Sequence, residues 1–430
     1  MAEHFLYIPS LGFFLLISYA LSLLYNDPRY KIVTVILTAC AVLFFLSLTI
    51  KQNNYWKDPL TFYTKTLEFS PDSSNIYNNL GRIYQNEGAL TKALSYYTKA
   101  IETDPNNDVT YYNRGSIYDS NGNYTQAIVD FNKAIKLNPN YPKSYNNRGH
   151  TYNNKGDYAQ AILDYNKSIE LDPTYPLAYN NRGDAYLNKG SYLDAIRDFN
   201  KAIELNPNYA EAYNHRGNAY NHQGNYAQAL LDYNKALELN PNYAEAYNNR
   251  GTFLGNKKNY AEALLDYNKA IDIDPKYEKA YLNRGIIYDR EDNFDEAISS
   301  YSKAIELNPR LIEAYSNRGS DYNNKGNYPK AILDYNQVIE INAKDWTAYF
   351  NRGIAHNNQG HLEQAVLDYS KAIELKPDLA QAYHNRASVY YNQKEYRKAL
   401  SDLQKAQELG AKIDPGFLEA VTKASTEPTQ

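Results

Sequence analysis

Side-chain amides recur along this chain at one fixed interval of 34 residues. The series holds nine asparagines and one histidine: Asn79, Asn113, Asn147, Asn181, His215, Asn249, Asn283, Asn317, Asn351 and Asn385. One amide group can donate to a carbonyl and accept from an N–H, so a row of them suits recognition of a peptide backbone with little sequence preference. The alternative is that the row satisfies neighbouring helix ends or solvates a surface, and the spacing alone leaves both interpretations open.

No catalytic or metal-binding constellation accompanies the row. His215 and His222 are two helical turns apart, but no cysteine or carboxylate completes a ligand set for zinc. A phosphate-binding loop, a nucleophile elbow and an HExxH motif are all missing from the sequence. We therefore predict a protein that is not an enzyme, with no catalytic residues, metal, cofactor or small-molecule substrate. The net charge of −4 argues against a nucleic-acid partner.

A second recurring pattern joins arginine to aspartate 16 residues later. The pairs are Arg114–Asp130, Arg148–Asp164, Arg182–Asp198, Arg216–Asp232, Arg250–Asp266, Arg318–Asp334, Arg352–Asp368 and Arg386–Asp402. The first copy lacks both partners and has Leu80 and Tyr96, whereas Arg284 faces Ser300. Joint loss of both residues predicts a planar contact between arginine and carboxylate, with a structural rather than an anion-binding role.

The elements that carry these residues repeat with the same period. Glycines from Gly81 to Gly353 are spaced by 34 residues, and Ala387 continues the series. Counted from position 1 at Ser74, ten units run without insertion to Ile413. Each unit has two amphipathic helical patterns, and most units have a glycine at position 15 and a proline at position 32. Tyrosine occupies position 4 in all ten units, which accounts for much of the unusual total of 46.

These units resemble tetratricopeptide repeats (TPRs). The resemblance implies an all-α fold, a right-handed superhelical solenoid of ten helix-turn-helix repeats that stack by nearest-neighbour contacts around a concave groove. Departures are few: Leu254 and His356 replace a ring, Ala343 replaces the proline, and three units lack the turn glycine. We expect Lys258, Asp292 and Lys394 at that turn to loosen it without changing the fold.

The asparagine row is similar to one in the repeats of O-GlcNAc transferase, which lines the inner groove and holds an extended peptide. Further asparagines are expected to face the groove: Asn146, Asn180, Asn214, Asn248, Asn153, Asn221, Asn323, Asn154, Asn188, Asn256 and Asn324. TPRs that bind chaperones clamp a C-terminal carboxylate with lysine and asparagine. Here the same slots hold pairs such as Asn78 with Arg82 and Asn146 with His150, so we expect no such ligand.

The N-terminal segment has another composition. Residues 5–25 and 32–50 are apolar runs long enough to cross a bilayer of about 30 Å as helices, and a short polar turn joins them. We predict a membrane hairpin with two spans, whose first helix starts after Pro9. Positive residues are nearly balanced on its two sides, so the charge count gives no orientation.

The opening Ala2 to Phe13 and the linker Asn54 to Pro59 resemble the part of transmembrane-and-TPR O-mannosyltransferases that precedes their repeats. This resemblance implies an array on the extracytoplasmic side, while the acidic catalytic loop of that family has no counterpart here. The predicted domains are a membrane hairpin (1–56), a linker with a partial repeat helix (57–73), ten repeats (74–413), and a capping helix with a disordered tail (414–430). We predict a membrane-anchored scaffold that binds extended peptide segments of partner proteins. The alternative is the non-catalytic, substrate-presenting part of a membrane O-glycosyltransferase.

Overall fold

A computed structural model describes residues 7–426, and every regular element in that range is an α-helix. The predicted features that involve residues 1–6, including the start of the first span, and residues 427–430 lie outside the described residues. The helices are α1 (Tyr7–Tyr25), α2 (Lys31–Tyr55), α3 (Pro59–Phe69), α4 (Ser74–Asn86), α5 (Leu90–Thr103), α6 (Asp108–Ser120), α7 (Tyr124–Leu137), α8 (Pro142–Asn154), α9 (Tyr158–Leu171), α10 (Pro176–Asn188), α11 (Tyr192–Leu205), α12 (Ala210–Gln223), α13 (Tyr226–Leu239), α14 (Ala244–Asn256), α15 (Tyr260–Ile273), α16 (Glu278–Arg290), α17 (Phe294–Leu307), α18 (Ile312–Asn324), α19 (Tyr328–Ile341), α20 (Trp346–Asn358), α21 (Leu362–Leu375), α22 (Ala380–Asn392), α23 (Tyr396–Glu408) and α24 (Pro415–Thr426).

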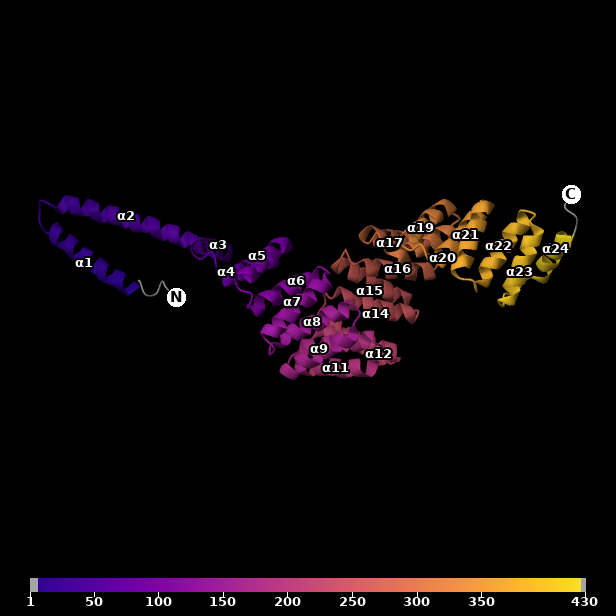
Figure 1. Cartoon of the computed structure of the whole chain (residues 1–430), viewed down its shortest axis with the longest axis horizontal. Coiled ribbons are helices and arrows are strands. Elements are labelled where there is room, and N and C mark those ends of the chain that lie inside the picture. The colour runs from indigo at the N-terminus through magenta and orange to yellow at the C-terminus, as the bar shows by residue number, and fades with distance from the viewer. Residues whose placement is uncertain (1–6, 427–430) are drawn as a thin grey trace. The chain divides into compact units, whose positions relative to one another are not determined.

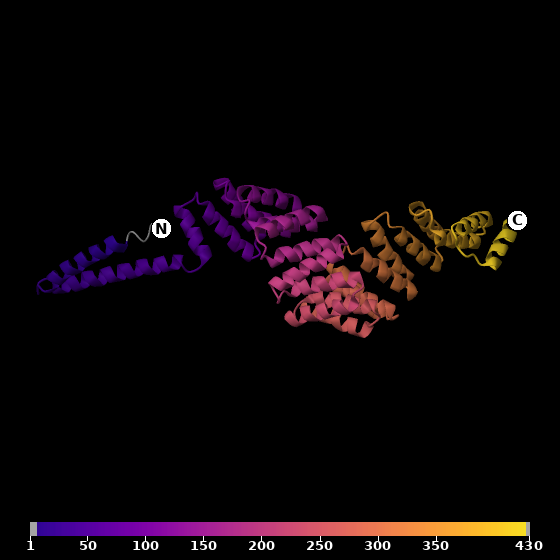
Figure 2. The same ribbon diagram turned by 90° about the horizontal axis from the view of Figure 1, so that it is seen from below.

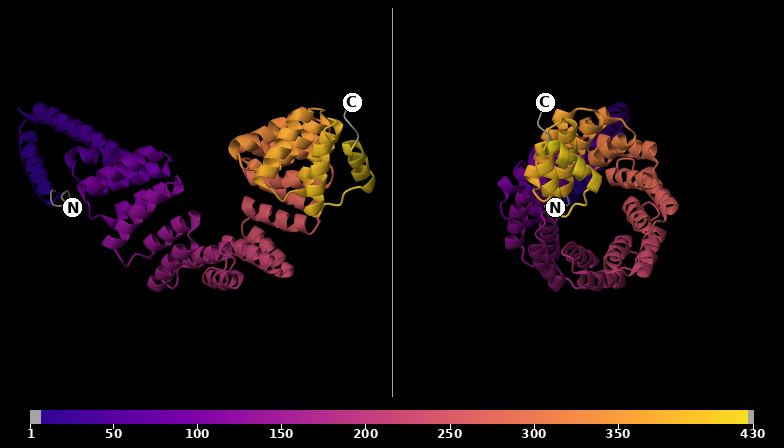
Figure 3. Two further views of the ribbon diagram at one scale, coloured as in Figure 1. Left: turned by 45° about the vertical axis from the view of Figure 1, so that its right-hand side comes forward. Right: turned by 90° about the vertical axis from the view of Figure 1, so that its right-hand side faces the viewer.

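The helices from α4 to α23 form consecutive antiparallel pairs, one pair for each predicted repeat. The chain divides into two compact units, residues 1–185 and 186–430, and the boundary falls within α10. In the first unit α4 to α9 lie side by side in chain order (Figure 1 and Figure 2). In the second unit α11 to α23 do the same (Figure 3). Each repeat therefore contacts mainly the repeats next to it along the chain.

The two N-terminal helices run antiparallel and are joined by a tight turn (Figure 1). Among the described residues, one stretch, Lys31–Leu48 in α2, is a helix long and apolar enough to cross a membrane, and Leu15–Tyr25 is a shorter apolar helix. The expectation that the first helix starts after Pro9 is wrong, because α1 begins at Tyr7. Pro9 lies in the first turn of α1, where the missing N–H has no helical partner in any case.

Both ends of the array are covered by a further helix. Asp58 caps α3 by accepting a hydrogen bond of 2.8 Å from the Thr61 N–H, and α3 packs on α4. At the other end, Val421 of α24 is buried against Ala399 and Leu403 of the last repeat. The helix continues to Thr426, through residues that the sequence placed in a disordered tail.

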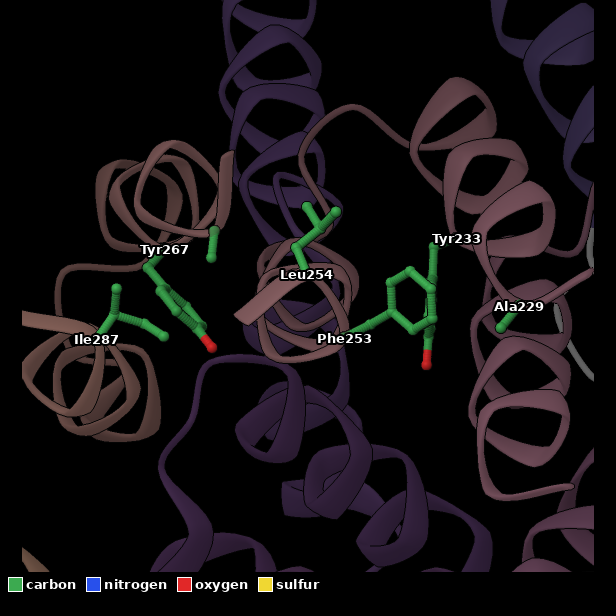
Figure 4. Packing of buried hydrophobic residues seen from close by; sticks show 7 residues of the cluster. Ala229, Tyr233, Phe253, Leu254, Tyr267 and Ile287 are labelled. Atoms are coloured by element: carbon green, nitrogen blue, oxygen red, sulfur yellow. The ribbon is translucent and has the colours of Figure 1, made fainter. Parts of the chain in front are cut away.

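A glycine at position 8 lets the two helices of a repeat approach each other. A Cβ built on Gly217 would lie 2.9 Å from Cε1 of Tyr233, the ring at position 24 of the same repeat. That ring is 1% exposed and packs against Phe253 of the next repeat, with 5.9 Å between the ring centroids. Figure 4 shows how Tyr233, Phe253 and Tyr267 extend this packing from one helix pair to the next. The core is thus a row of aromatic rings, each packed against a glycine of the partner helix.

The turn between the two helices of a repeat needs a left-handed residue. Gly224 has φ of +84°, and the same backbone conformation is adopted by Lys258 (+64°), Asp292 (+56°) and Lys394 (+61°). The turn hydrogen bonds persist: Lys258 N–H donates to Gly255 O at 3.0 Å, as Gly224 N–H donates to Asn221 O at 3.0 Å. These three replacements keep the turn geometry and add backbone strain.

We expect Lys258→Gly to stabilise the sixth repeat by about 0.5–1 kcal/mol, because the relief of left-handed strain exceeds the added freedom of glycine in the unfolded chain. Thermal unfolding followed by circular dichroism measures the change. The matched control is Gly224→Lys one repeat earlier, which should destabilise by a similar amount. Equal melting temperatures for all three proteins would show that the turn carries no strain.

Candidate functional site

The ten residues of the predicted row occupy position 6, on the first helix of each repeat. All ten side chains are partly exposed: Asn79, Asn113, Asn147 and Asn181 in the first unit, and His215, Asn249, Asn283, Asn317, Asn351 and Asn385 in the second. In the first nine repeats a glycine at position 8 and a ring at position 24 fix the helix that carries the ladder residue against its partner, and in the tenth Ala387 and Leu403 take their places. Within each unit the structure therefore presents these side chains from equivalent places on successive helices. We call this row the amide ladder.

Many ladder amides are tied to the preceding repeat. The Nδ2 of Asn113 donates to Oδ1 of Asn78 at 3.0 Å, and Asn181 donates in the same way to Asn146 at 3.1 Å. The second unit repeats this contact, with bonds of 3.1 Å from Asn249 to Asn214 and 2.9 Å from Asn283 to Asn248. In these four bonds the acceptor stands at position 5 of the preceding repeat, so each bond joins two neighbouring repeats.

The asparagines at position 5 are buried, whereas the sequence predicted that they would be exposed. Asn146, Asn180, Asn214 and Asn248 were expected to line the groove, but they are only 0–5% exposed. A buried amide carbonyl needs a donor, and the ladder residue of the next repeat supplies it for Asn146, Asn214 and Asn248. In these repeats position 5 is therefore part of the packing between repeats rather than a surface for a ligand.

The contact changes where position 5 is not asparagine. Asn147 donates instead to the hydroxyl of Tyr112 at 3.0 Å. In the seventh, eighth and ninth repeats position 5 holds Leu282, Ser316 and Phe350. The ladder residues of the repeats that follow them are Asn317, Asn351 and Asn385, in the same order. Asn317 and Asn385 lie beside the hydroxyls of Tyr301 and Tyr369. The last three ladder amides are thus not tied to position 5 of the preceding repeat.

The hydrogen-bonding capacity of the ladder follows from these contacts. An amide side chain has two N–H donors and a carbonyl oxygen with two lone pairs. A ladder residue tied to position 5 uses one donor there. Asn147 and Asn283 also donate bonds of 3.4 Å to Ser116 and Thr252. The carbonyls of Asn147 and Asn249 accept from Asn146 and Asn248, which leaves each carbonyl one free lone pair. The amides of the last three repeats keep more of their capacity. The ladder is therefore both a link between repeats and a set of exposed amides.

A second link between repeats joins position 12 to position 9 of the next repeat. In the first unit Nδ1 of His150 lies 2.9 Å from Oδ2 of Asp119, and Asn153 donates to Asp184 at 2.8 Å. The hydrogen bond to Asp119 raises the pKa of His150. His150 is thus paired with a neighbour within the array. Sequence reasoning overlooked this link, although the 31-residue spacing was visible.

The arginine and aspartate pairs form the predicted planar contact. In seven of them the guanidinium donates two hydrogen bonds of 2.5–2.9 Å to the two carboxylate oxygens. Arg284 donates to Ser300 at 3.1 Å. The remaining Nη1 reaches the preceding repeat, as in the bond of 2.6 Å from Arg250 to Asn234. Each arginine therefore joins three helices, and its role is structural.

His215 and His222, the two histidines considered above as zinc ligands, pack against aromatic rings. His222 stacks on Tyr192 with 5.3 Å between ring centroids and 7° between planes. His215 lies against Phe199 at 5.8 Å. Within residues 7–426 the structure places no three His, Cys, Asp or Glu side chains where they could hold a metal ion together.

Comparison with known families assigns the array. The family described as Tetratricopeptide repeat matches residues 74–107, 109–141, 131–162, 210–243, 244–277, 278–311 and 380–411. A related family described as TPR repeat matches residues 149–190, 183–224, 319–360 and 356–394. The chain belongs to the tetratricopeptide repeat family. Proteins of this family bind protein or peptide partners, and the array is a scaffold for protein–protein interaction.

Individual proteins give narrower matches. The mouse (Mus musculus) protein O-mannosyl-transferase TMTC3 is 27% identical over 94 residues, and the match covers 22% of this chain and 10% of that protein. The chain therefore spans about a tenth of the length of this curated relative. Among solved structures, YrrB, titled a TPR protein with an unusual peptide-binding site, is 28% identical with a TM-score of 0.32, and covers 43% of this chain and 95% of its own. MamA is 30% identical with a TM-score of 0.33, and the shares are 38% and 95%.

Proposed function

We propose that this tetratricopeptide repeat protein is a membrane-anchored scaffold that binds an extended peptide segment of a partner along the amide ladder. One observation carries the proposal: a partly exposed amide, or His215 in one repeat, stands at position 6 of every repeat. Amides presented at regular intervals can pair with successive peptide groups of an extended segment, because each can donate to C=O and accept from N–H. Such bonds act on the backbone and leave the ligand sequence broadly free.

The ladder is expected to bind most strongly through its last three amides. Asn317, Asn351 and Asn385 are not tied to position 5 of the preceding repeat, so more of their hydrogen-bonding capacity is left for a ligand, although Asn317 and Asn385 also interact with the hydroxyls of Tyr301 and Tyr369. Asn249 and Asn283 already donate to the buried carbonyls of Asn214 and Asn248. Truncation of these two residues removes a link between repeats, whereas truncation of the last three removes a ligand contact.

We expect the triple variant Asn317→Ala/Asn351→Ala/Asn385→Ala to lose at least about tenfold in peptide affinity with little change in melting temperature, since each lost hydrogen bond costs about 0.5–1.5 kcal/mol. The matched control is Asn249→Ala/Asn283→Ala in the same unit. It should lower the melting temperature, because two buried carbonyls lose their donors at about 1–3 kcal/mol each. The probe is a synthetic pool of random peptides, from which binders to the detergent-solubilised chain are selected and their affinities measured by fluorescence anisotropy.

N-methylation of the peptide backbone distinguishes binding through the backbone from binding through the side chains. A peptide held by its backbone should lose affinity when alternate peptide nitrogens carry a methyl group, although its side chains are unchanged. Full affinity of the methylated peptide, or of the wild-type peptide for the triple variant, would contradict the proposal.

The proposed anchor is the hairpin of α1 and α2. Large apolar side chains on both helices are exposed, such as Leu16 at 71% and Ile32 at 76%, which suits contact with lipid tails. The stretch Lys31–Leu48 has the length and composition of a span, and we propose the first helix as a second span. The extracytoplasmic side for the array is proposed from the likeness to the O-mannosyltransferase family.

The match to TMTC3 favours a second candidate, in which the array presents a polypeptide substrate to a membrane O-glycosyltransferase. The same groove and the same ladder serve both candidates, and they differ in the fate of the bound segment. Mass spectrometry of segments recovered on the full chain from its own membranes distinguishes them. Serine or threonine residues that carry O-linked hexose support the second candidate, and unmodified segments support the free scaffold.

A further inference from the structure

One carboxyl group lies where every other repeat has an uncharged residue. Asp321 stands at position 10 of the eighth repeat and is 0% exposed, and neither of its carboxyl oxygens has a geometric hydrogen-bond partner among the described residues. The equivalent residues are Ile83, Ile117, Thr151, Ala185, Ala219, Phe253, Ile287, Ala355 and Val389. Burial of an ionised carboxylate without a partner costs several kcal/mol. The site therefore needs an interaction that keeps the carboxyl group of Asp321 uncharged.

The group that faces Asp321 is a second carboxyl. Asp289 stands at position 12 of the seventh repeat, on α16, and its side chain and charge act on Asp321 directly. In the first unit the equivalent position 12 meets a complementary group of the next repeat: Asp119 meets His150, and Asn153 meets Asp184. At the joint between the seventh and eighth repeats two acids meet instead.

No basic group in the part of the chain that the structure describes acts on Asp321. From α17 the buried hydroxyl of Tyr301 lies close to both carboxyls and has no geometric partner, and from α19 Tyr335 lies close to Asp321. On α18 itself, Arg318 is bound to Asp334 and Lys325 to Asp295. The histidine of α20, His356, faces Asp368, Arg352 and His361.

We propose that Asp289 and Asp321 share one proton and form a pH-sensitive joint between the seventh and eighth repeats. A proton between two carboxyl oxygens supplies the missing donor and removes one of the two negative charges. Loss of that proton leaves two anions at a buried contact, so the packing of α16 and α17 against α18 weakens. The joint is most stable in acid and loosens as the pH rises through neutrality.

The direction of the effect follows from proton binding. Burial first, and then the hydrogen bond and charge of Asp289, raise the pKa of Asp321 to about 8. An aspartate in the unfolded chain has a pKa of about 3.9. Between these values the folded joint holds a proton that the unfolded chain has lost, so the contribution of this pair to stability is greatest below about pH 4 and falls as the pH rises to about 8. The equilibrium constant for closing the joint should drop by about tenfold per pH unit in this window.

The test compares melting temperatures of the full chain in detergent from about pH 5 to about pH 9. The wild type should lose stability across this range, whereas Asp321→Asn, which needs no proton to stay neutral, should give a flatter profile and the higher melting temperature at about pH 9. Asp295→Asn is the control, because Asp295 is a carboxylate near the same helices whose side chain is 78% exposed. Infrared spectra at neutral pH should show a protonated carboxyl band in the wild type that Asp321→Asn lacks.

Two results would overturn the proposal. Equal slopes for the wild type and Asp321→Asn, together with no protonated carboxyl band, would mean that no proton is shared. A melting temperature that rises in millimolar Ca²⁺ or Mg²⁺, with the rise lost in Asp321→Asn, would mean that the two acids hold a divalent cation instead. If Asp321→Asn does not fold, Asp289→Asn removes the second acid from the partly exposed side, and its pH profile should be flattened in the same way.

Discussion

Replacement of Asp266 by alanine is expected to destabilise the sixth repeat by about 2–4 kcal/mol. Asp266 is 5% exposed and accepts two hydrogen bonds from Arg250, of 2.8 Å from Nε and 2.7 Å from Nη2. Without it the guanidinium keeps its bond to Asn234 but has no counter-charge in a place mostly closed to water. The expected cost is below that of a fully buried pair, because the side chain of Arg250 is 23% exposed and water can reach part of it.

The chain itself supplies the control for this prediction. In the first repeat the same two positions hold Leu80 and Tyr96, and that repeat packs without an ion pair. Tyr96 stacks on Tyr84 with 5.3 Å between the ring centroids. The double variant Arg250→Leu/Asp266→Tyr copies these two residues, with Leu254 in the place of Tyr84, and should recover most of the stability that Asp266→Ala loses, because well-packed apolar groups can replace a buried ion pair at little cost.

Hydrogen exchange locates the effect, because a repeat array opens locally and a melting temperature alone does not say which repeat opens. Asp266→Ala should lower protection in α14 and α15 and in the helices beside them, while repeats further along keep theirs. Peptide affinity measured through the last three ladder amides should be nearly unchanged. Uniform loss of protection, or a double variant as unstable as the single one, would show that the pair does not act as a local link.

The sequence predicted this pair well because both partners vary together. The first repeat lacks both, and Arg284, which lacks its aspartate, finds Ser300 at 3.1 Å. The period and the turn residues likewise predicted the helix pairs. A strict 34-residue repeat turns each local choice into many equivalent observations, which is why the fold could be derived from one chain.

The arrangement of the amides could not be derived in the same way. Positions 5 and 6 are both asparagine in several repeats, and composition cannot tell a buried amide from an exposed one. The outcome depends on how far one repeat rotates on the next, which brings Asn249 to Asn214 at 3.1 Å. The acid pair of Asp289 and Asp321 was missed for a related reason, since a contact between repeats has no signature within one repeat.

The close packing of the ring at position 24 against the glycine at position 8 leads to a last prediction. Gly353→Ala should destabilise the ninth repeat by about 1–3 kcal/mol, because the added Cβ would lie 2.8 Å from Cε1 of Tyr369. The ring is 1% exposed and has little room to move away. Local hydrogen exchange in α20 and α21 again measures the effect.

The tenth repeat shows how this clash is relieved. It has alanine at position 8 and, instead of a ring, Leu403 at position 24, and both residues are fully buried. The double variant Gly353→Ala/Tyr369→Leu copies this combination. Tyr369→Leu alone should cost about 1–3 kcal/mol through the space it leaves. The two substitutions together should cost less than their sum, since the methyl group of one fills part of the space left by the other. Strictly additive costs would mean that Gly353 serves the helix backbone and not the ring.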